Sequence, residues 1–383
     1  MSLFILAHFS HHFTAALFQP LMPFIRDDFN LDYTQVGWIM SAFTLAYGIS
    51  HLPAGWLSDR LGPRLMITIG ISGVALFAIL TGVAPTYLAM VIFMVLLGVM
   101  GGGYHPAASP VVSASVDERN RGRALGLHQI GGTASFFLTP LIAVAIASAL
   151  GWRGSVITMS IPAFIIGIVL FVLLGKRGYA QKAPEVTASR QAKPREPSGN
   201  IRRLIPFITL GVVLQVMIFS VASYIPLFAV DNLKASEETG ALLFSLFHFA
   251  GLWAGPIGGY LSDRLGKVPV MLTVSIVAGP AVYLLSLASL GWSIWLVLLA
   301  IGICMYIAMP VTEAYIITHA PEHRRSTVLG VYYFASRGGV GLIILAVGYL
   351  ADRFSFETSF SMVGGAVLGV ALICSVFLWG RRD

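Results

Sequence analysis

Two formally charged side chains, Glu313 and Arg337, lie inside long apolar stretches of this sequence. Seven histidines share such stretches: His8, His11, His12, His51, His105, His128 and His248. Charges at membrane depth are costly, and they usually face a cavity or one another. Imidazole titrates in the physiological pH range and can store or pass a proton, whereas the forked donors of arginine suit a carboxylate or a phosphonate. The combination predicts anion binding together with proton transfer.

No motif in the sequence indicates an enzyme or a resident metal. There is no HExxH, no GxSxG, no P-loop and no cluster of carboxylates. Cys304 and Cys374 lack the CxxC spacing of metal or redox sites. The net charge of +7 does not indicate nucleic-acid binding, because no polar segment combines aromatic and basic residues in a strip. We therefore expect no catalytic residue, no metal ligand, no cofactor and no nucleic-acid partner.

These residues are carried by a strongly apolar chain. Of its 383 residues, 57% are hydrophobic and 11% are charged, whereas soluble chains contain about 25% charged residues. A stretch of about 20 apolar residues can cross a hydrocarbon core about 30 Å thick. We predict an all-α integral membrane protein whose twelve transmembrane helices lie near residues 4–25, 34–57, 65–84, 86–113, 125–149, 153–174, 203–230, 241–260, 269–289, 293–319, 328–350 and 357–379.

Basic residues divide the predicted loops into two sets. Most Lys and Arg residues lie in alternate loops and at the chain ends, which the positive-inside rule assigns to the cytoplasm. Both termini are then cytoplasmic, which agrees with an even number of helices. The longest polar stretch, Gly175 to Arg203, predicts a flexible linker. The expected domains are a six-helix bundle at 1–174, a cytoplasmic linker at 175–203 and a second six-helix bundle at 204–383.

The sequence also contains an internal repeat with an offset of 204 residues. The segment GWLSDRLGPR from Gly55 to Arg64 returns as GYLSDRLGKV from Gly259 to Val268. The same offset carries Pro106 onto Pro310. Self-similarity at a fixed offset indicates duplicated structural units. We therefore expect two six-helix bundles with pseudo-symmetric folds.

Two halves of six predicted helices, joined by a linker and each carrying this loop motif, resemble the major facilitator superfamily. Tyr104-His105-Pro106, followed by a Gly-rich helix, looks most similar to fosmidomycin-resistance-type exporters, with organic-anion symporters second. The resemblance implies alternating access, in which the halves rock around a site at the repeat interface. In the family, charges of the loop motif latch the cytoplasmic side, which implies the gating residues Asp59, Arg60, Asp117, Glu118, Asp263 and Arg264.

Several polar residues share one depth in the predicted bilayer. Counted at 1.5 Å per residue from the cytoplasmic helix ends, His12, His105, Gln215, His248 and Arg337 all lie roughly 13 to 18 Å deep. Polar residues on the same helix faces extend this set. The predicted substrate-binding residues are Arg337, His12, Gln19, His105, Gln129, Gln215, Tyr333 and His248. The predicted proton-coupling residues are Glu313, His11, His12 and His105.

These residues predict a secondary transporter of the prokaryotic inner membrane that moves a small anionic organic solute, coupled to protons. We expect its partners to be the solute, protons and the lipid bilayer, and the chain to be monomeric. Two other functions stay open: a proton-driven exporter of drugs or cations that uses Glu313, and a receptor or scaffold that binds without transport. A permanent ion pair between Glu313 and Arg337 is a structural alternative to anion binding.

Overall fold

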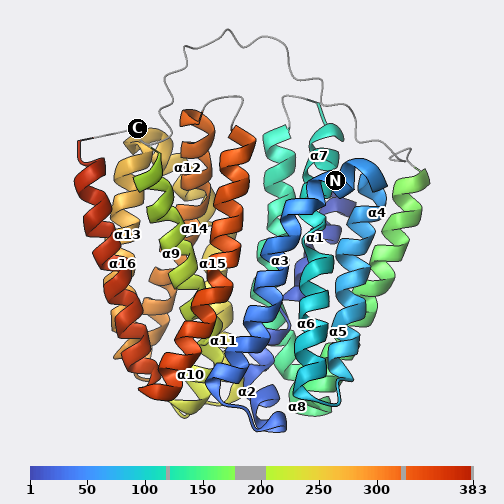
Figure 1. The fold of residues 1–383 in the computed structure, drawn as a ribbon, viewed down its shortest axis with the longest axis horizontal. Helices are drawn as coiled ribbons and strands as arrows, with labels where there is room; N and C mark the ends of the chain where they lie inside the picture. Colours follow the sequence, from blue (N-terminus) through green and yellow to red (C-terminus); the bar gives the residue numbers. More distant parts are fainter. Residues whose placement is uncertain (118–120, 177–203, 321–324, 381–383) are drawn as a thin grey trace. The chain divides into compact units, whose positions relative to one another are not determined.

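The computed structural model of the chain describes residues 1–117, 121–176, 204–320 and 325–380, and every regular element in these ranges is a helix (Figure 1). The first half contains α1 (Ser2–Ala15), α2 (Phe18–Phe29), α3 (Tyr33–Leu61), α4 (Pro63–Thr68), the π-helical turn η1 (Ile69–Gly73), α5 (Val74–Gly82), α6 (Tyr87–Gly101), α7 (Tyr104–Ala114) and α8 (Arg121–Lys176). The second half contains α9 (Ile205–Ser223), α10 (Ile225–Asp231), α11 (Glu237–Phe249), the 3-10 turn η4 (Ala250–Leu252), α12 (Ala254–Leu265), α13 (Lys267–Ser286), α14 (Trp292–His319), α15 (Arg325–Arg353) and α16 (Phe356–Leu378).

The helices of the described ranges form twelve membrane spans, as the sequence predicts. Eight helical segments are long and apolar enough to cross a membrane, and the bent pair formed by α11 and α12 is a ninth. α8 holds two spans, because Gly151 breaks it with φ 70° and ψ 165°. We assign the remaining two spans to α1 with α2, and to α3.

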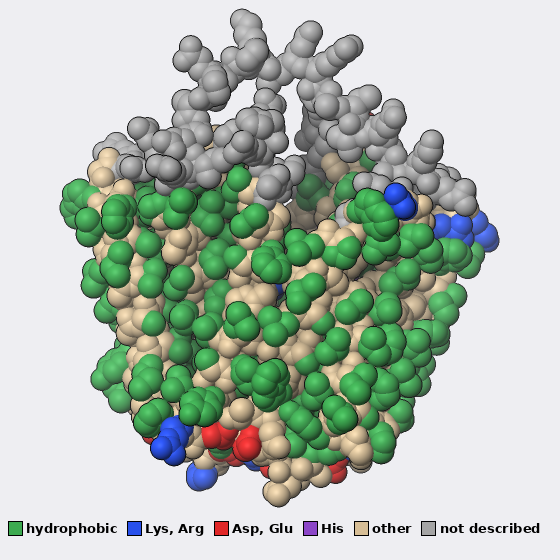
Figure 2. All heavy atoms as spheres, viewed as in Figure 1, with side chains coloured by type: hydrophobic (Ala, Val, Ile, Leu, Met, Phe, Trp, Pro, Cys, Tyr) green, Lys and Arg blue, Asp and Glu red, His purple; other side chains and the backbone are tan. Residues whose placement is uncertain are grey.

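Apolar side chains are exposed along the helices. Hydrophobic groups cover the middle of the face drawn in Figure 2, and charged groups lie near its two ends. Val376, for example, is 74% exposed, and Leu88 and Trp292 are also exposed. A surface of this kind suits contact with lipid tails, which are as apolar as the side chains themselves. The chain is therefore a multi-pass membrane protein.

The chain divides into two compact units. The first unit comprises Met1–Leu31 with Trp38–Gln191, and the second comprises Asp32–Gly37 with Ala192–Asp383. The predicted linker lies almost wholly outside the described residues, since 177–203 are not among them. The linker and the domain bounds therefore stay predictions.

The start of α3 belongs to the second unit because it is held by an aspartate at the end of α15. The backbone N–H groups of Tyr33 and Thr34 donate to the Asp352 carboxylate at 2.9 and 2.7 Å, and the Thr34 hydroxyl donates to it as well. The first N–H groups of a helix have no partner within the helix, and a carboxylate there also interacts favourably with the helix dipole. Asp352 thus acts as an N-cap for α3 from 318 residues away.

The internal repeat is visible in the backbone of both loop motifs. Gly62 ends α3 with φ 81° and ψ 150°, and Gly266 ends α12 with φ 96° and ψ 148°. A side chain at either position is strained, because L-residues rarely adopt this region. The glycine of the repeated motif is therefore required by the same turn in both halves.

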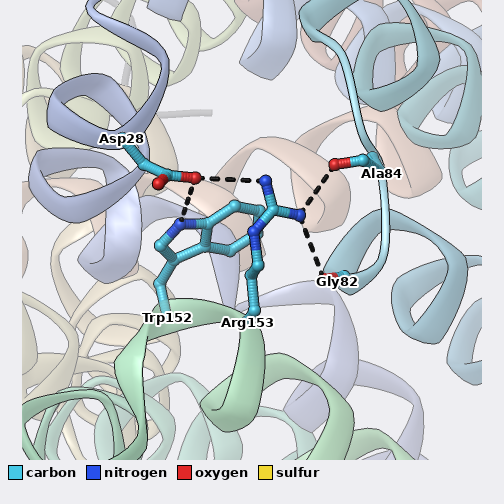
Figure 3. A network of polar contacts seen from close by, with 5 residues as sticks. All are labelled: Asp28, Gly82, Ala84, Trp152 and Arg153. Atoms are coloured by element: carbon cyan, nitrogen blue, oxygen red, sulfur yellow. Dashed lines mark hydrogen bonds and ion pairs between the residues drawn. The ribbon is translucent and has the colours of Figure 1, made fainter.

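The short stretch between the two spans of α8 is fixed by a polar network in the first unit (Figure 3). Arg153 donates to the carbonyl oxygens of Gly82 and Ala84 at 3.2 and 2.7 Å, and it forms an ion pair of 3.1 Å with Asp28. The indole N–H of Trp152 donates to the same carboxylate oxygen at 3.1 Å. One guanidinium thus joins the ends of α2 and α5 to the middle of α8, next to the break at Gly151.

Arg153→Ala is expected to lower the apparent melting temperature in detergent by a few degrees. The variant loses hydrogen bonds from a charged donor, but Arg153 and Asp28 are partly exposed, which limits the loss to about 1 kcal/mol. Arg153→Lys keeps the charge without the fork and should show an intermediate melting temperature. Equal melting temperatures of the wild type and Arg153→Ala would show that the network around Arg153 does not stabilise the fold.

Candidate functional site

Six histidine rings gather in the first unit, and we call His8, His11, His12, His51, His105 and His128 the histidine cluster. They come from α1, α3, α7 and α8. The ring centroids of His8 and His12 lie 4.8 Å apart, those of His8 and His105 lie 5.1 Å apart, and those of His12 and His105 lie 5.2 Å apart. His128 stacks on His8 at 4.2 Å. The predicted site residues His11, His12 and His105 are therefore neighbours.

Irregular helix segments position the cluster. The π-helical turn Ile69–Gly73 presents the Gly70 carbonyl, which accepts a hydrogen bond of 2.7 Å from Nδ1 of His11. π-helical turns are rare and often occur at functional sites. His105 lies in the first turn of α7, directly after the break at residues 102–103. A Cβ at Gly132 would lie 2.7 Å from Cε1 of His8, so this glycine lets α8 approach α1.

The hydrogen bonds of the cluster fix where the ring protons lie. Nδ1 of His8 donates to the carbonyl of His128 at 2.7 Å, and Nδ1 of His128 donates to that of Phe4 at 3.0 Å. Because a carbonyl only accepts, the neutral rings carry their proton on Nδ1 and keep a lone pair on Nε2. Within the described part of the chain, Nε2 of His8 and Nε2 of His128 are buried without a hydrogen-bond partner.

A second group of polar residues lies in the second unit, and we call it the α14–α15 network: Gln215, His248, Tyr306, Glu313, Tyr332, Tyr333 and Arg337. His248 on α11 and the Tyr306 hydroxyl on α14 are hydrogen-bonded at 2.7 Å. The Tyr332 hydroxyl on α15 donates to Oε1 of Gln215 on α9 at 3.3 Å. Four helices therefore contribute polar groups to this network.

The two formally charged residues of the network lie in membrane-spanning helices that pack against each other, Glu313 on α14 and Arg337 on α15. Tyr333 lies four residues before Arg337 on α15, on the same helix face. A carboxyl, a guanidinium and phenol groups together can bind an anion or exchange a proton.

A family model and known relatives identify the chain. The model of the Major Facilitator Superfamily matches residues 4–240 and again residues 208–383. The chain belongs to the Major Facilitator Superfamily. Superfamily proteins are membrane transporters and not enzymes, and they bind small-molecule substrates.

Three relatives in the superfamily align over nearly the whole chain. The chain is 26% identical to the "Probable L-galactonate transporter" of Escherichia coli, over 92% of this chain and 83% of the relative. It is 27% identical to the probable sulfoacetate transporter of Cupriavidus necator, over 93% of this chain and 87% of the relative. It is 24% identical to the fosmidomycin resistance protein of Escherichia coli, over 98% of this chain and 92% of the relative. The resemblance seen in the sequence is thereby confirmed.

A solved structure shows the same superfamily fold. It is a transporter of the POT family in complex with 5-aminolevulinic acid, with a TM-score of 0.82, 14% identity, and coverage of 98% of this chain and 95% of the other. At this identity the similarity establishes the fold and leaves the substrate open.

Four of the predicted gating residues lie in the two copies of the loop motif: Asp59, Arg60, Asp263 and Arg264. The guanidinium of Arg60 lies over the Trp56 ring at 4.1 Å, and that of Arg264 lies over the Tyr260 ring at 4.6 Å. Asp117 and Asp263 are exposed. Glu118 and the side chain of Asp59 lie outside the described part of the structure. The gating roles remain predictions.

Two predicted binding residues, Gln19 and Gln129, belong neither to the histidine cluster nor to the α14–α15 network. Gln19 is buried on α2, and Gln129 lies on an exposed face of α8 beside the buried His128. Tyr306 and Tyr332 were not among the predicted site residues. Both are large aromatic residues on apolar helices, which usually indicates core packing, although a buried tyrosine hydroxyl needs a hydrogen-bond partner.

Proposed function

We propose that this protein is a secondary transporter of the prokaryotic inner membrane that moves a small organic anion by alternating access, coupled to protons. The observation that carries the proposal is the presence of Arg337 and Glu313 in two membrane-spanning helices that pack against each other, α15 and α14. Protonation of Glu313 would remove the negative charge near Arg337. The guanidinium would then attract an anionic solute, which couples proton binding to solute binding.

The names of the relatives support an anionic substrate. One is named for L-galactonate and another for sulfoacetate, both of which are small organic anions. Their shared chemistry is a carboxylate or sulfonate group of the kind that a forked guanidinium binds. The predicted residues within each unit belong to the proposal, with Glu313, His11, His12 and His105 in proton coupling.

Proteoliposomes containing the purified chain test the proposal directly. L-galactonate and sulfoacetate serve as probes, with internal solute measured at equal and unequal pH on the two sides. Uptake of at least one probe, increased by the pH gradient, is expected. Equal uptake with and without the pH gradient would contradict proton coupling. Binding of a probe without any uptake would favour the receptor or scaffold function.

Glu313 favours one competing function, the export of a cationic drug. A carboxylate inside a membrane span can bind a cation directly, and a multidrug resistance protein of Citrobacter koseri is among the relatives. Ethidium efflux from the same proteoliposomes distinguishes the two functions. Efflux that is abolished by Glu313→Gln and unaffected by Arg337→Ala would replace the anion proposal.

Glu313→Gln is expected to uncouple transport while leaving solute exchange intact. Glutamine cannot ionise, so Arg337 stays available to the anion at every pH. A carrier that couples one proton should accumulate solute about tenfold for a pH difference of one unit. In the variant the accumulation ratio should fall to one, whereas exchange of internal for external probe should continue. Accumulation equal to that of the wild type would exclude Glu313 as the coupling residue.

The remaining expectations belong to the same proposal. Both termini and the linker at 175–203 are cytoplasmic, and the two six-helix bundles at 1–174 and 204–383 move as halves of a monomer. The residues Asp59, Arg60, Asp117, Glu118, Asp263 and Arg264 gate its cytoplasmic side.

A further inference from the structure

Three members of the histidine cluster have the arrangement of a metal site. Nitrogen atoms of His8, His12 and His105 all lie within 4.8 Å of one another. His8 and His12 are four residues apart on α1, a spacing that places two histidines on one helix face in known metal motifs. His105 comes from the first turn of α7. We propose that these three side chains bind a divalent transition-metal ion.

His8 supplies the independent observation that points to a ligand. Its side chain is 2% exposed, and its Nε2 has no hydrogen-bond partner among the described residues. Buried polar atoms are rarely left without a partner, because the loss of hydration is not repaid. Metal-binding histidines typically donate their other ring N–H to a carbonyl, which orients the ring. The bond from Nδ1 of His8 to the His128 carbonyl has this form.

The three imidazole rings must move slightly closer together to bind one metal ion. Zinc binds histidine nitrogen at 2.0–2.1 Å in a tetrahedral arrangement, which places neighbouring nitrogens roughly 3.3 Å apart. The separation of up to 4.8 Å must therefore shorten by up to about 1.5 Å, as small rotations of the rings allow.

The donor set selects the class of metal. Imidazole suits zinc, copper, nickel and cobalt, whereas magnesium and calcium prefer oxygen ligands. Three histidines leave one position of a tetrahedral site open. Because neutral imidazoles do not offset the charge of a dication at membrane depth, we infer that an anion, such as hydroxide or a carboxylate, takes this position.

Cobalt binding to the full-length chain, purified without a polyhistidine tag and stripped with a chelator, tests the proposal. Titration of Co²⁺ alone should produce the visible absorption of tetrahedral cobalt with one ion per chain, and Zn²⁺ but not Mg²⁺ should displace it. His12→Gln and His105→Gln should each weaken binding by at least about tenfold. His319→Gln is the matched control, since His319 lies on α14, where its Nδ1 contacts the Tyr315 carbonyl.

The Co²⁺ titrations test the metal site without a transport assay. Unchanged Co²⁺ affinity in both cluster variants, or equal loss in His319→Gln, would overturn the site. Because His8→Gln could impair folding of the packed cluster, the partly buried His105 is the main variant, with thermal melting checked in the same samples. The site shares His12 and His105 with the proposed proton-coupling residues, but Co²⁺ binding is measured without transport, so the two proposals can fail separately.

Discussion

Arg337→Ala is expected to raise the half-saturating concentration of the transported anion, L-galactonate or sulfoacetate, by about 10- to 100-fold. Hydrogen bonds to a charged group contribute about 1.5–3 kcal/mol each, and each 1.4 kcal/mol changes affinity about tenfold. Initial uptake rates in proteoliposomes over a range of probe concentrations measure the effect. Arg337→Lys keeps the charge but not the paired donors. Its half-saturating concentration should lie between those of the wild type and Arg337→Ala.

Arg353→Ala is the matched control for this prediction. Arg353 is an exposed residue at the end of the same helix, α15, whereas Arg337 lies in its middle. Its loss changes the net charge by the same amount and should leave the half-saturating concentration unchanged. An Arg337→Ala variant with wild-type affinity for the probe would contradict the anion site.

Removal of Arg337 also leaves Glu313 without its cationic neighbour, which could destabilise the second unit. An unpaired charge at membrane depth is unfavourable. The double variant Arg337→Ala with Glu313→Gln removes both charges and avoids this effect. If Arg337 binds the anion, the double variant stays defective in affinity. If the two residues only stabilise α14 against α15, the double variant recovers both melting temperature and uptake.

The sequence predicted the features that depend on composition and periodicity. The apolar stretches gave the twelve spans, and the offset of 204 residues gave the duplicated units. Polar residues were recognisable because each polar group inside an apolar helix needs a partner. This reasoning was enough to select His11, His12 and His105, which the structure brings together.

The irregular parts of the helices could not be predicted in the same way. The π-helical turn at Ile69–Gly73 inserts one residue into a helix, and its glycines and its single serine are residue types that also occur in regular membrane helices. Its effect, a carbonyl presented to His11, depends on a tertiary contact 59 residues away. Likewise, Asp352 caps α3 only because the fold places the end of α15 there. Such contacts are set by packing and leave no local pattern in the sequence.

The second large effect is expected at a pair of repeat-related glycines. A Cβ at Gly98 would collide with the Phe43 carbonyl and lie 2.9 Å from Cβ of Ala46. A Cβ at Gly302 would collide with the Phe247 carbonyl, again one repeat of 204 residues away. Both glycines therefore permit the same close helix crossing, and small residues at such crossings are typical of membrane helices.

Gly98→Val and Gly302→Val are each expected to prevent assembly of a stable protein. The obstacle at both positions is backbone, which cannot rotate away as a side chain can, so the cost exceeds the roughly 1–3 kcal/mol of ordinary overpacking. The yield of monodisperse protein in size-exclusion chromatography measures the loss. Gly369→Val on α16 is the control, since among the described residues no atom lies within 4 Å of its Cβ position. Wild-type yields for both Gly98→Val and Gly302→Val would show that the crossings adjust, and that duplication does not preserve a required contact.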